Sequence, residues 1–201
     1  MHKMNRSLFL IFVYFLSSTF NVYSMSVYEV PAPEGYEERK KLQFEILDKI
    51  NQKLEKKYQM NTSAIGSSGD GCLLKSVSIS FQRFEGPMTL DENRKILLDC
   101  IGIYIDAFNN NEKIRSFLSN YPFTEKNIEL IIHSYGKDGE RLYHPMICCA
   151  LNYPNGISYY TNDPENECRD KEEIKETYQE AYSKLKETKE NQTKQSELTE
   201  T

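Results

Sequence analysis

Apolar and polar side chains alternate along Leu74–Phe84 (LKSVSISFQRF), and this alternation limits the folds open to the chain. Val77, Ile79 and Phe81 fall on one face of an extended segment, whereas serines and a glutamine fall on the other. Such a half-buried strand belongs to a sheet that is covered on one face and wet on the other. The rest of the chain must therefore supply the covering layer.

Two helical segments are the candidates for that layer. Leucine and isoleucine recur every four residues between Tyr36 and Met60, and charged residues occupy the other face. A second helix begins after Thr89, where Glu92 completes a capping box, and is expected to end near Phe108. We expect both helices to pack against the apolar face of the sheet.

Three more strands are expected in the C-terminal half. Asn127–Tyr135 and Arg141–Leu151 flank a Gly-Lys-Asp-Gly turn, which is typical of a hairpin. The turn Pro154–Gly156 then leads into a short strand, Ile157–Thr161. Pro145 inside the second segment removes a ladder donor and favours an edge or a bulge at that point.

The remaining segments complete the expected order. Thr62–Gly71 is rich in serine and glycine and is interpreted as a flexible connection, and Asn162–Asp170 as a polar loop. Helices are expected at Glu112–Leu118 and Lys171–Leu185. The order α-β-α-α-β-β-β-α predicts a single α+β domain, with an antiparallel four-stranded sheet and helices packed mainly on one face.

Residues 1–24 have the pattern of a signal peptide. Lys3 and Arg6 precede the apolar run Leu8–Leu16, and Val22–Ser24 resembles a cleavage site. The run is too short for a comfortable bilayer span, which needs about 20 residues. An uncleaved N-terminal anchor is the alternative. We expect an exported protein, periplasmic or secreted, with no membrane span after signal removal.

The expected boundaries follow from composition. Residues 25–35 form an extended lead-in because Pro31 and Pro33 oppose a helix. The domain covers residues 36–186, and residues 187–201 lack periodic apolar positions and are expected to be a disordered polar tail.

The charge of the chain excludes some partners. The formal net charge is −5; residues 1–24 hold two basic and no acidic residues, so their removal leaves 23 basic against 30 acidic residues, or −7. An acidic protein argues against nucleic acid or an anionic membrane as the main partner. Thr62–Gly71 lacks the spacing of a phosphate-binding loop, and no cofactor is expected.

Three strings carry a resemblance to a known family: Tyr121–Thr124 (YPFT), Thr161–Asn166 (TNDPEN) and Glu176–Ala181 (ETYQEA), arranged around the expected hairpin. Together they resemble a family of small exported proteins of chlamydiae that has no assigned activity. The resemblance covers residues 120–182 and implies a Gram-negative-type envelope or secretion into a host-derived compartment. Some members carry a lipid-anchor cysteine after the signal, whereas the first cysteine here is Cys72.

Five cysteines in an exported protein leave at least one thiol without an intrachain partner. Cys72, at a strand start, and Cys168, in a loop, are the candidates for a disulfide. Cys100 lies beside the apolar stripe of its helix and is expected to be a buried thiol. Cys148 and Cys149 point to opposite faces of their strand and are poor partners for each other.

Two histidines offer a candidate metal site. His133 and His144 would face each other across the hairpin if Asp138 and Gly139 form a two-residue loop, whereas a three-residue loop would separate them. Opposed imidazoles can bind a metal ion, although no third ligand is evident. The alternative is a pair of ordinary strand histidines.

Four tyrosines, Tyr143, Tyr153, Tyr159 and Tyr160, are the candidate binding surface. Tyrosine on an open sheet face is typical of an interaction surface, although it can also cover the edge of a core. We therefore expect a non-catalytic binding or interaction module whose partner is a protein or an envelope component.

The alternative function is a hydrolase or a metal-dependent enzyme centred on His133, His144 and Cys148 or Cys149. A catalytic cysteine usually lies in an electropositive cleft that lowers its pKa. These cysteines are instead expected within an apolar strand, which raises the pKa of a thiol. The sequence therefore favours binding over catalysis.

Overall fold

The computed structural model describes residues 32–199, so the predicted signal peptide and most of the expected lead-in lie outside the described residues. Side chains are described except at positions 167, 168 and 189–199. The elements and their bounds are α2 (Tyr36–Tyr58), β1 (Met60–Asp70), β2 (Leu73–Arg83), α3 (Leu90–Asn109), α4 (Glu112–Arg115), the 3-10 helix η1 (Glu125–Asn127), β3 (Ile128–Ser134), β4 (Cys149–Tyr153), β5 (Gly156–Asp163), β6 (Asn166–Glu176) and α5 (Tyr178–Thr199).

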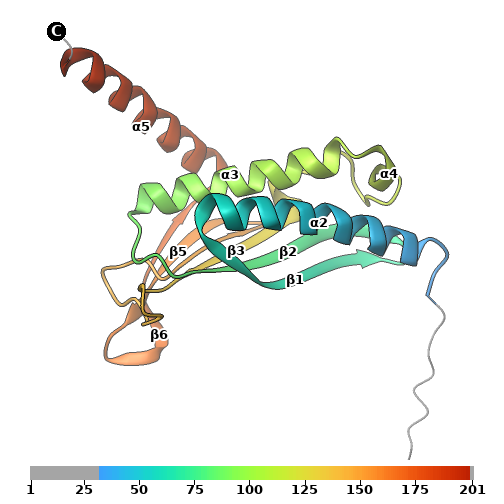
Figure 1. Cartoon of the computed structure of the whole chain (residues 1–201), viewed down its shortest axis with the longest axis horizontal. Helices are drawn as coiled ribbons and strands as arrows, with labels where there is room; N and C mark the ends of the chain where they lie inside the picture. Colours follow the sequence, from blue (N-terminus) through green and yellow to red (C-terminus); the bar gives the residue numbers. More distant parts are fainter. Residues whose placement is uncertain (1–31, 200–201) are drawn as a thin grey trace, which may run out of the picture. The chain divides into compact units, whose positions relative to one another are not determined.

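The α+β class is confirmed, but the expected antiparallel four-stranded sheet is wrong. One mixed sheet of six strands, in the order β1-β2-β3-β4-β5-β6, runs through the domain (Figure 1). The two additional strands are its edges, β1 and β6. The segment expected to be a flexible connection is β1, and the expected polar loop and helix start are β6.

Neither edge strand carries the alternation that reveals a half-buried strand. Positions 63–70 of β1 are all exposed, and serine and glycine predominate there. The strand forms because it is joined to β2 by a tight turn, in which Gly71 has a φ of 56°, and pairs with it from Met60 to Asp70. Pairing with a neighbour has overridden a weak local β-propensity.

One pair of the sheet is parallel, which the expected all-antiparallel order missed. Strands β2 and β3 run in the same direction, with Val77 opposite Ile128 and Phe81 opposite Ile132. The helix α3 lies between them in the chain and returns it to the starting end of β2. A strand, a helix and a neighbouring strand connected in this way form a parallel crossover.

The expected antiparallel pairing of Asn127–Tyr135 with Arg141–Leu151 is confirmed, but the continuous ladder across a tight turn is wrong. Strand β3 pairs with β4, but β4 begins only at Cys149, and the Gly-Lys-Asp-Gly turn lies inside the long connection between them. Tyr135 and Arg141 form an isolated bridge beside that turn. Pro145, which cannot donate to a ladder, lies in this connection and is consistent with the late start of β4.

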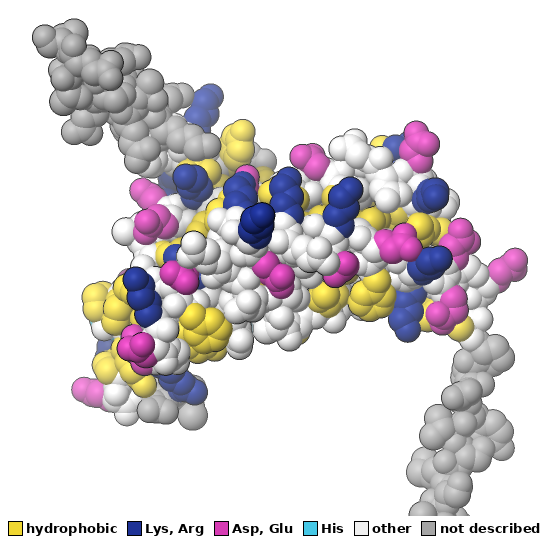
Figure 2. Space-filling model, viewed as in Figure 1, with side chains coloured by type: hydrophobic (Ala, Val, Ile, Leu, Met, Phe, Trp, Pro, Cys, Tyr) yellow, Lys and Arg dark blue, Asp and Glu magenta, His cyan; other side chains and the backbone are white. Residues whose placement is uncertain are grey.

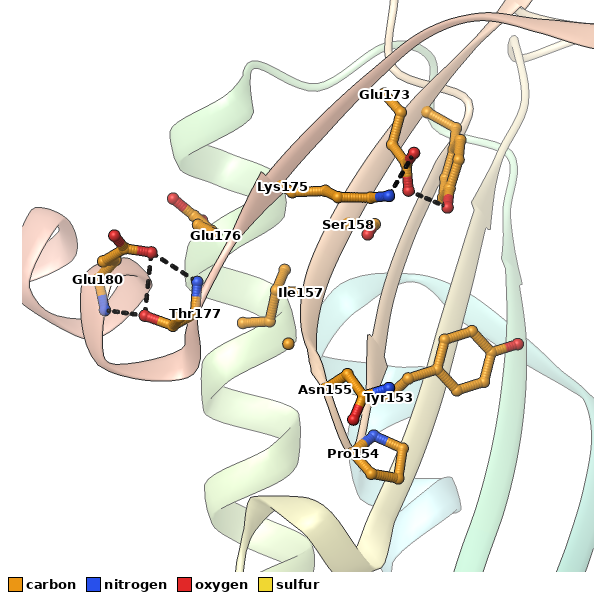
Figure 3. Close-up of a pocket in the computed structure, with 12 residues that line it drawn as sticks. Tyr153, Pro154, Asn155, Ile157, Ser158, Glu173, Lys175, Glu176, Thr177 and Glu180 are labelled. Carbon is orange, nitrogen blue, oxygen red and sulfur yellow. Dashed lines mark hydrogen bonds and ion pairs between the residues drawn. The ribbon is translucent and has the colours of Figure 1, made fainter.

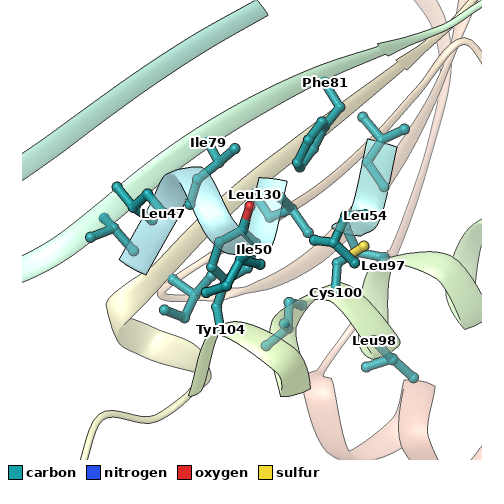
Figure 4. Close-up of a cluster of buried hydrophobic side chains, with 14 of the residues drawn as sticks. Leu47, Ile50, Leu54, Ile79, Phe81, Leu97, Leu98, Cys100, Tyr104 and Leu130 are labelled. Atoms are coloured by element: carbon teal, nitrogen blue, oxygen red, sulfur yellow. The ribbon is translucent and has the colours of Figure 1, made fainter. Parts of the chain in front are cut away.

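The core lies between the sheet and the helices α2 and α3, which cover the same face (Figure 1). The alternating residues of β2 that were expected to be apolar and buried, Val77, Ile79 and Phe81, are at most 2% exposed. They pack with leucines and isoleucines of the two helices in one cluster (Figure 4). The capping box of α3, Thr89 with Glu92, is present as predicted.

The last helix begins and ends later than expected. Lys171 to Glu176 belong to β6, and α5 extends through residues expected to be a disordered tail, to Thr199. Thr177 and Glu180 form a capping box at its start. Glutamate, lysine and glutamine, which are good helix formers, are frequent in this segment, although the segment lacks apolar periodicity.

A buried ionic network ties the C-terminal elements to α3. The side chains of Arg94 and Glu176 are 4% and 1% exposed and lie 2.8 Å apart, Nε to Oε1. Tyr159 donates to the same carboxylate at 2.7 Å and Lys184 at 2.9 Å. The network joins α3, β5, β6 and α5.

In residues 32–199 we find no helix that combines the length and the apolar character needed to cross a bilayer.

Candidate functional site

The face of the sheet opposite α2 and α3, which we call the open face, carries two rows of side chains in register. The first row crosses five strands and contains Gln82, His133, Cys149, Tyr160 and Glu173. Each residue is the ladder partner of the next, so neighbouring Cβ atoms lie about 5 Å apart. The row brings together residues that are 91 positions apart in the sequence, from Gln82 to Glu173.

The second row lies beside the first and is more apolar at its centre. It contains Ser80, Ile131, Leu151, Ser158 and Lys175. Ile131 and Leu151 are partly buried although no described helix covers them. The open face therefore has an apolar centre with a charged border at β6.

Two hollows flank the tyrosines of this face. One, of about 510 Å³, is lined by His133, Cys149, Leu151, Tyr153 and Tyr160 together with residues of the connection before β4. We call it the histidine hollow. The other, of about 670 Å³, lies towards the start of α5, and we call it the lysine hollow. Its lining, shown in Figure 3, includes Lys175 and Glu180 besides Tyr153 and Tyr160. Both tyrosines thus line both hollows.

A short polar chain borders the lysine hollow. Tyr160 donates a hydrogen bond from its hydroxyl to Glu173, and Lys175 Nζ lies 2.8 Å from Glu173 Oε2. The bond to Glu173 raises the pKa of Tyr160, and Lys175 lowers the pKa of Glu173. The tyrosine is therefore neutral and the carboxylate charged at neutral pH.

The chemistry of the histidine hollow disfavours nucleophilic catalysis. Burial raises the pKa of Cys149 to about 12, so the thiol is protonated at neutral pH. Burial also lowers the pKa of His133 below its usual 6.5, so the imidazole is neutral. A neutral histidine beside a protonated thiol can donate and accept hydrogen bonds, but it lacks the charge separation of an activated cysteine.

The structure places the four candidate tyrosines differently. Tyr153 and Tyr160 share the open face, and Tyr153 is 44% exposed. Tyr159 points to the opposite face, is 1% exposed and donates to Glu176, so it belongs to the core. Tyr143 lies in the connection before β4, where it bridges to Asn162. Of the four candidate tyrosines, Tyr153 and Tyr160 therefore share the open face.

The two candidate metal ligands do not meet. The ladder pairs His133 with Cys149, and His144 instead lies in the connection, 3.3 Å from the Thr161 hydroxyl and 3.6 Å from Glu172. Among the side chains that the structure describes, no three from histidine, cysteine or acidic residues gather closely enough to hold a metal ion.

The candidate disulfide is not supported by the topology. Cys72 lies in the β1–β2 turn, whereas position 168 lies near the β5–β6 turn, and the ladders place these turns at opposite ends of the sheet. A disulfide needs Cα atoms within about 7 Å. Cys72, Cys100, Cys148 and Cys149 are free thiols, and Cys100 is fully buried, as predicted. The side chain of Cys168 lies outside the described set.

Sequence reasoning missed the contribution of β6 to the open face. Glu173 and Lys175 were assigned to a helix, so their position beside Tyr160 and Ser158 was hidden. The alternation of charged residues around the single apolar Ile174 was the available signal.

Comparisons with family models, with curated proteins and with solved structures each find no match for this chain.

Proposed function

We propose that this is an exported, non-catalytic binding protein that holds a protein or an envelope component against the open face of its sheet. One observation carries the proposal: Tyr153 and Tyr160 stand between two hollows, on the face that α2 and α3 leave free. Tyrosine is enriched at the centres of interfaces, where it supplies both apolar area and a polar group.

The composition of the open face supports a protein-sized partner. Ile131 and Leu151 supply apolar area at the centre of the open face, and the ion pair of Glu173 and Lys175 makes one of its borders charged. An apolar centre with a polar rim is the usual anatomy of an interface. The two hollows offer places for side chains of the partner.

The hydrolase or metal-dependent alternative has less support. His133 and His144 are separated, and the raised pKa of Cys149 removes the thiolate that a nucleophilic mechanism requires. Export rests on the sequence of residues 1–24. An intact mass of the protein purified from its native cell would test it, and a chain cleaved after Ser24 is the expected result.

Site-specific photocrosslinking tests the binding proposal. A photoreactive amino acid replaces Leu151 or Tyr153 on the open face, or Tyr182, which is 58% exposed on α5, as the control. We expect one partner to be crosslinked from positions 151 and 153 in the native cell and not from position 182. Equal crosslinking from all three positions, or none from the open face, would reject the proposal.

A further inference from the structure

The two edges of the sheet are protected to very different degrees. Eight of the 11 residues of β6 are charged, whereas β1 has one charged residue, Asp70, among 11 and no proline. Charged residues and prolines are the usual means by which proteins prevent unwanted pairing at a sheet edge. Strand β1 has neither a charged residue nor a proline before Asp70, at its end, so its outer edge can accept another strand.

The available part of this edge begins after Thr62. The backbone N–H of Thr62 donates to Glu55 Oε1 of α2 at 2.8 Å, which occupies that amide. The following residues, 63–70, are exposed, and β2 is their only partner strand among the described residues. An edge of eight residues is long enough for strand addition, a common mode of peptide recognition.

A hollow of about 140 Å³ lies between α2 and this edge. Phe44 of α2 and Ile65 of β1 line it, and they are 45% and 39% exposed, so together they offer apolar area beside the edge. Figure 2 shows apolar side chains on the molecular surface in the region of α2 and β1. A strand added to β1 would direct alternate side chains towards this hollow.

Arg39 at the same hollow is buried without a charged partner among residues 32–199. It is 6% exposed, its Nη1 donates to Gln43 Oε1 at 2.7 Å, and its guanidinium lies 4.8 Å from the centre of the Tyr36 ring. Within the described part of the chain, its Nε has no hydrogen-bond partner and no carboxylate forms an ion pair with it. A buried cation without a counter-ion is costly, and a carboxylate in the hollow would offset that cost.

We propose that the groove between α2 and β1 binds an extended acidic segment of a partner protein. The segment adds to residues 63–70 as a further strand, places an aspartate or glutamate on Arg39, and places an apolar side chain two residues away against Phe44 and Ile65. The planar guanidinium suits a carboxylate because two parallel N–H groups can donate to its two oxygens. This groove is separate from the open face and does not depend on it.

Peptide selection against the full chain tests the site. A displayed library of random nine-residue peptides is selected on the wild type, and the selected peptides are then titrated onto Arg39→Met and onto the control Lys41→Met, which loses the same charge from an exposed position of α2. We expect an acidic residue two positions from an apolar one in the selected peptides. Their affinity should fall at least tenfold for Arg39→Met and less than twofold for Lys41→Met.

Two further measurements bear on the mode of binding. Amide hydrogen exchange in residues 63–70 should slow on addition of a selected peptide, since strand addition protects backbone N–H groups. The urea midpoint of free Arg39→Met should equal or exceed that of the wild type, because the substitution removes an unpaired buried cation. The open-face variant Tyr153→Ala should bind the peptides as the wild type does.

Several results would overturn the proposal. These are the failure to select any peptide, selected peptides without an acidic residue, equal binding to Arg39→Met, or a clear fall of its urea midpoint. The lead-in, residues 25–35, contains an acidic residue at Glu29. If residues 63–70 are protected in the free protein and the protection disappears in Glu29→Gln, the groove would instead be assigned to the chain's own N-terminal segment. Concentration-dependent dimerisation that protects the same residues would assign it to a second copy of the chain.

Discussion

The buried network around Glu176 gives the sharpest stability prediction. Arg94 meets two carboxylates among the described side chains: Glu176, which is buried with it, and Asp91, which is 55% exposed; Glu176→Ala removes the buried one. The guanidinium would then keep only its bond to Asp91, with its Nε and Nη2 groups unpaired, and the hydroxyl of Tyr159 would remain buried without its acceptor. Breaking a buried ion pair in this way costs about 3–5 kcal/mol.

Urea unfolding followed by circular dichroism measures this cost. With an m-value of about 2 kcal/mol per M, a loss of about 4 kcal/mol lowers the midpoint by about 2 M. We expect Arg94→Met to be similarly destabilising, because it leaves Glu176 buried and charged with only Tyr159 and the half-exposed Lys184 beside it. The double variant Arg94→Met/Glu176→Met should be less destabilised than the sum of the two, since apolar residues can replace a buried pair.

The pH dependence of the same network has a definite sign. Burial opposes the charge of Glu176, but the hydrogen bonds from Arg94, Lys184 and Tyr159 outweigh it and lower the pKa of the carboxyl below its usual value. The carboxylate therefore contributes stability that is full above the unfolded pKa of about 4.3 and is lost as the pH falls through the lower folded pKa. Two results of the urea experiment would refute this account of the network: destabilisations of Glu176→Ala and Arg94→Met that leave their midpoints within about 0.3 M of the wild type, or a double variant whose loss equals the sum of the single losses.

Three further predictions concern single contacts. Tyr104→Phe removes the buried 2.5 Å bond to Asn51 and should cost about 1–3 kcal/mol in urea unfolding, and a loss below 0.5 kcal/mol would contradict it. Thr89→Ala removes the capping box with Glu92 and should lower the free energy of unfolding by about 1 kcal/mol in the same assay. An unchanged free energy of unfolding would contradict this prediction. The pKa of Cys149 is raised to about 12, so its thiolate fraction at pH 8 should be about 10⁻⁴. Its alkylation rate, followed by mass spectrometry, should therefore be far lower than that of an exposed cysteine. An equal rate would restore the case for catalysis.

The elements that bury an apolar stripe were predictable from sequence, and the edges of the sheet were not. Strand β2 and helices α2 and α3 face the core, so their periodicity records their environment. Strands β1 and β6 face solvent over much of their length, and their conformation is imposed by pairing with β2 and β5. In β1 no local pattern reports this pairing, and in β6 the only trace of it is the set of charged residues on both sides of Ile174.

The candidate site could also be predicted only in part from the sequence. Tyr153 and Tyr160 were identified from the turn and strand around them, but Tyr159, their neighbour, faces the core. Whether His133 met His144 depended on a register that the long connection before β4 decides. Arg39 gave no signal, because a buried arginine in a helix looks like any other charged helical residue until its surroundings are known.

The affinity of the partner identified by crosslinking tests the central claim most directly. The purified partner is titrated onto the wild type, onto Tyr153→Ala and onto Tyr182→Ala, both of which remove an exposed tyrosine. If the open face binds the partner, the affinity falls at least tenfold, which is about 1.4 kcal/mol, for Tyr153→Ala and stays within twofold for Tyr182→Ala. An unchanged affinity for Tyr153→Ala would contradict the assignment of the open face as the binding surface.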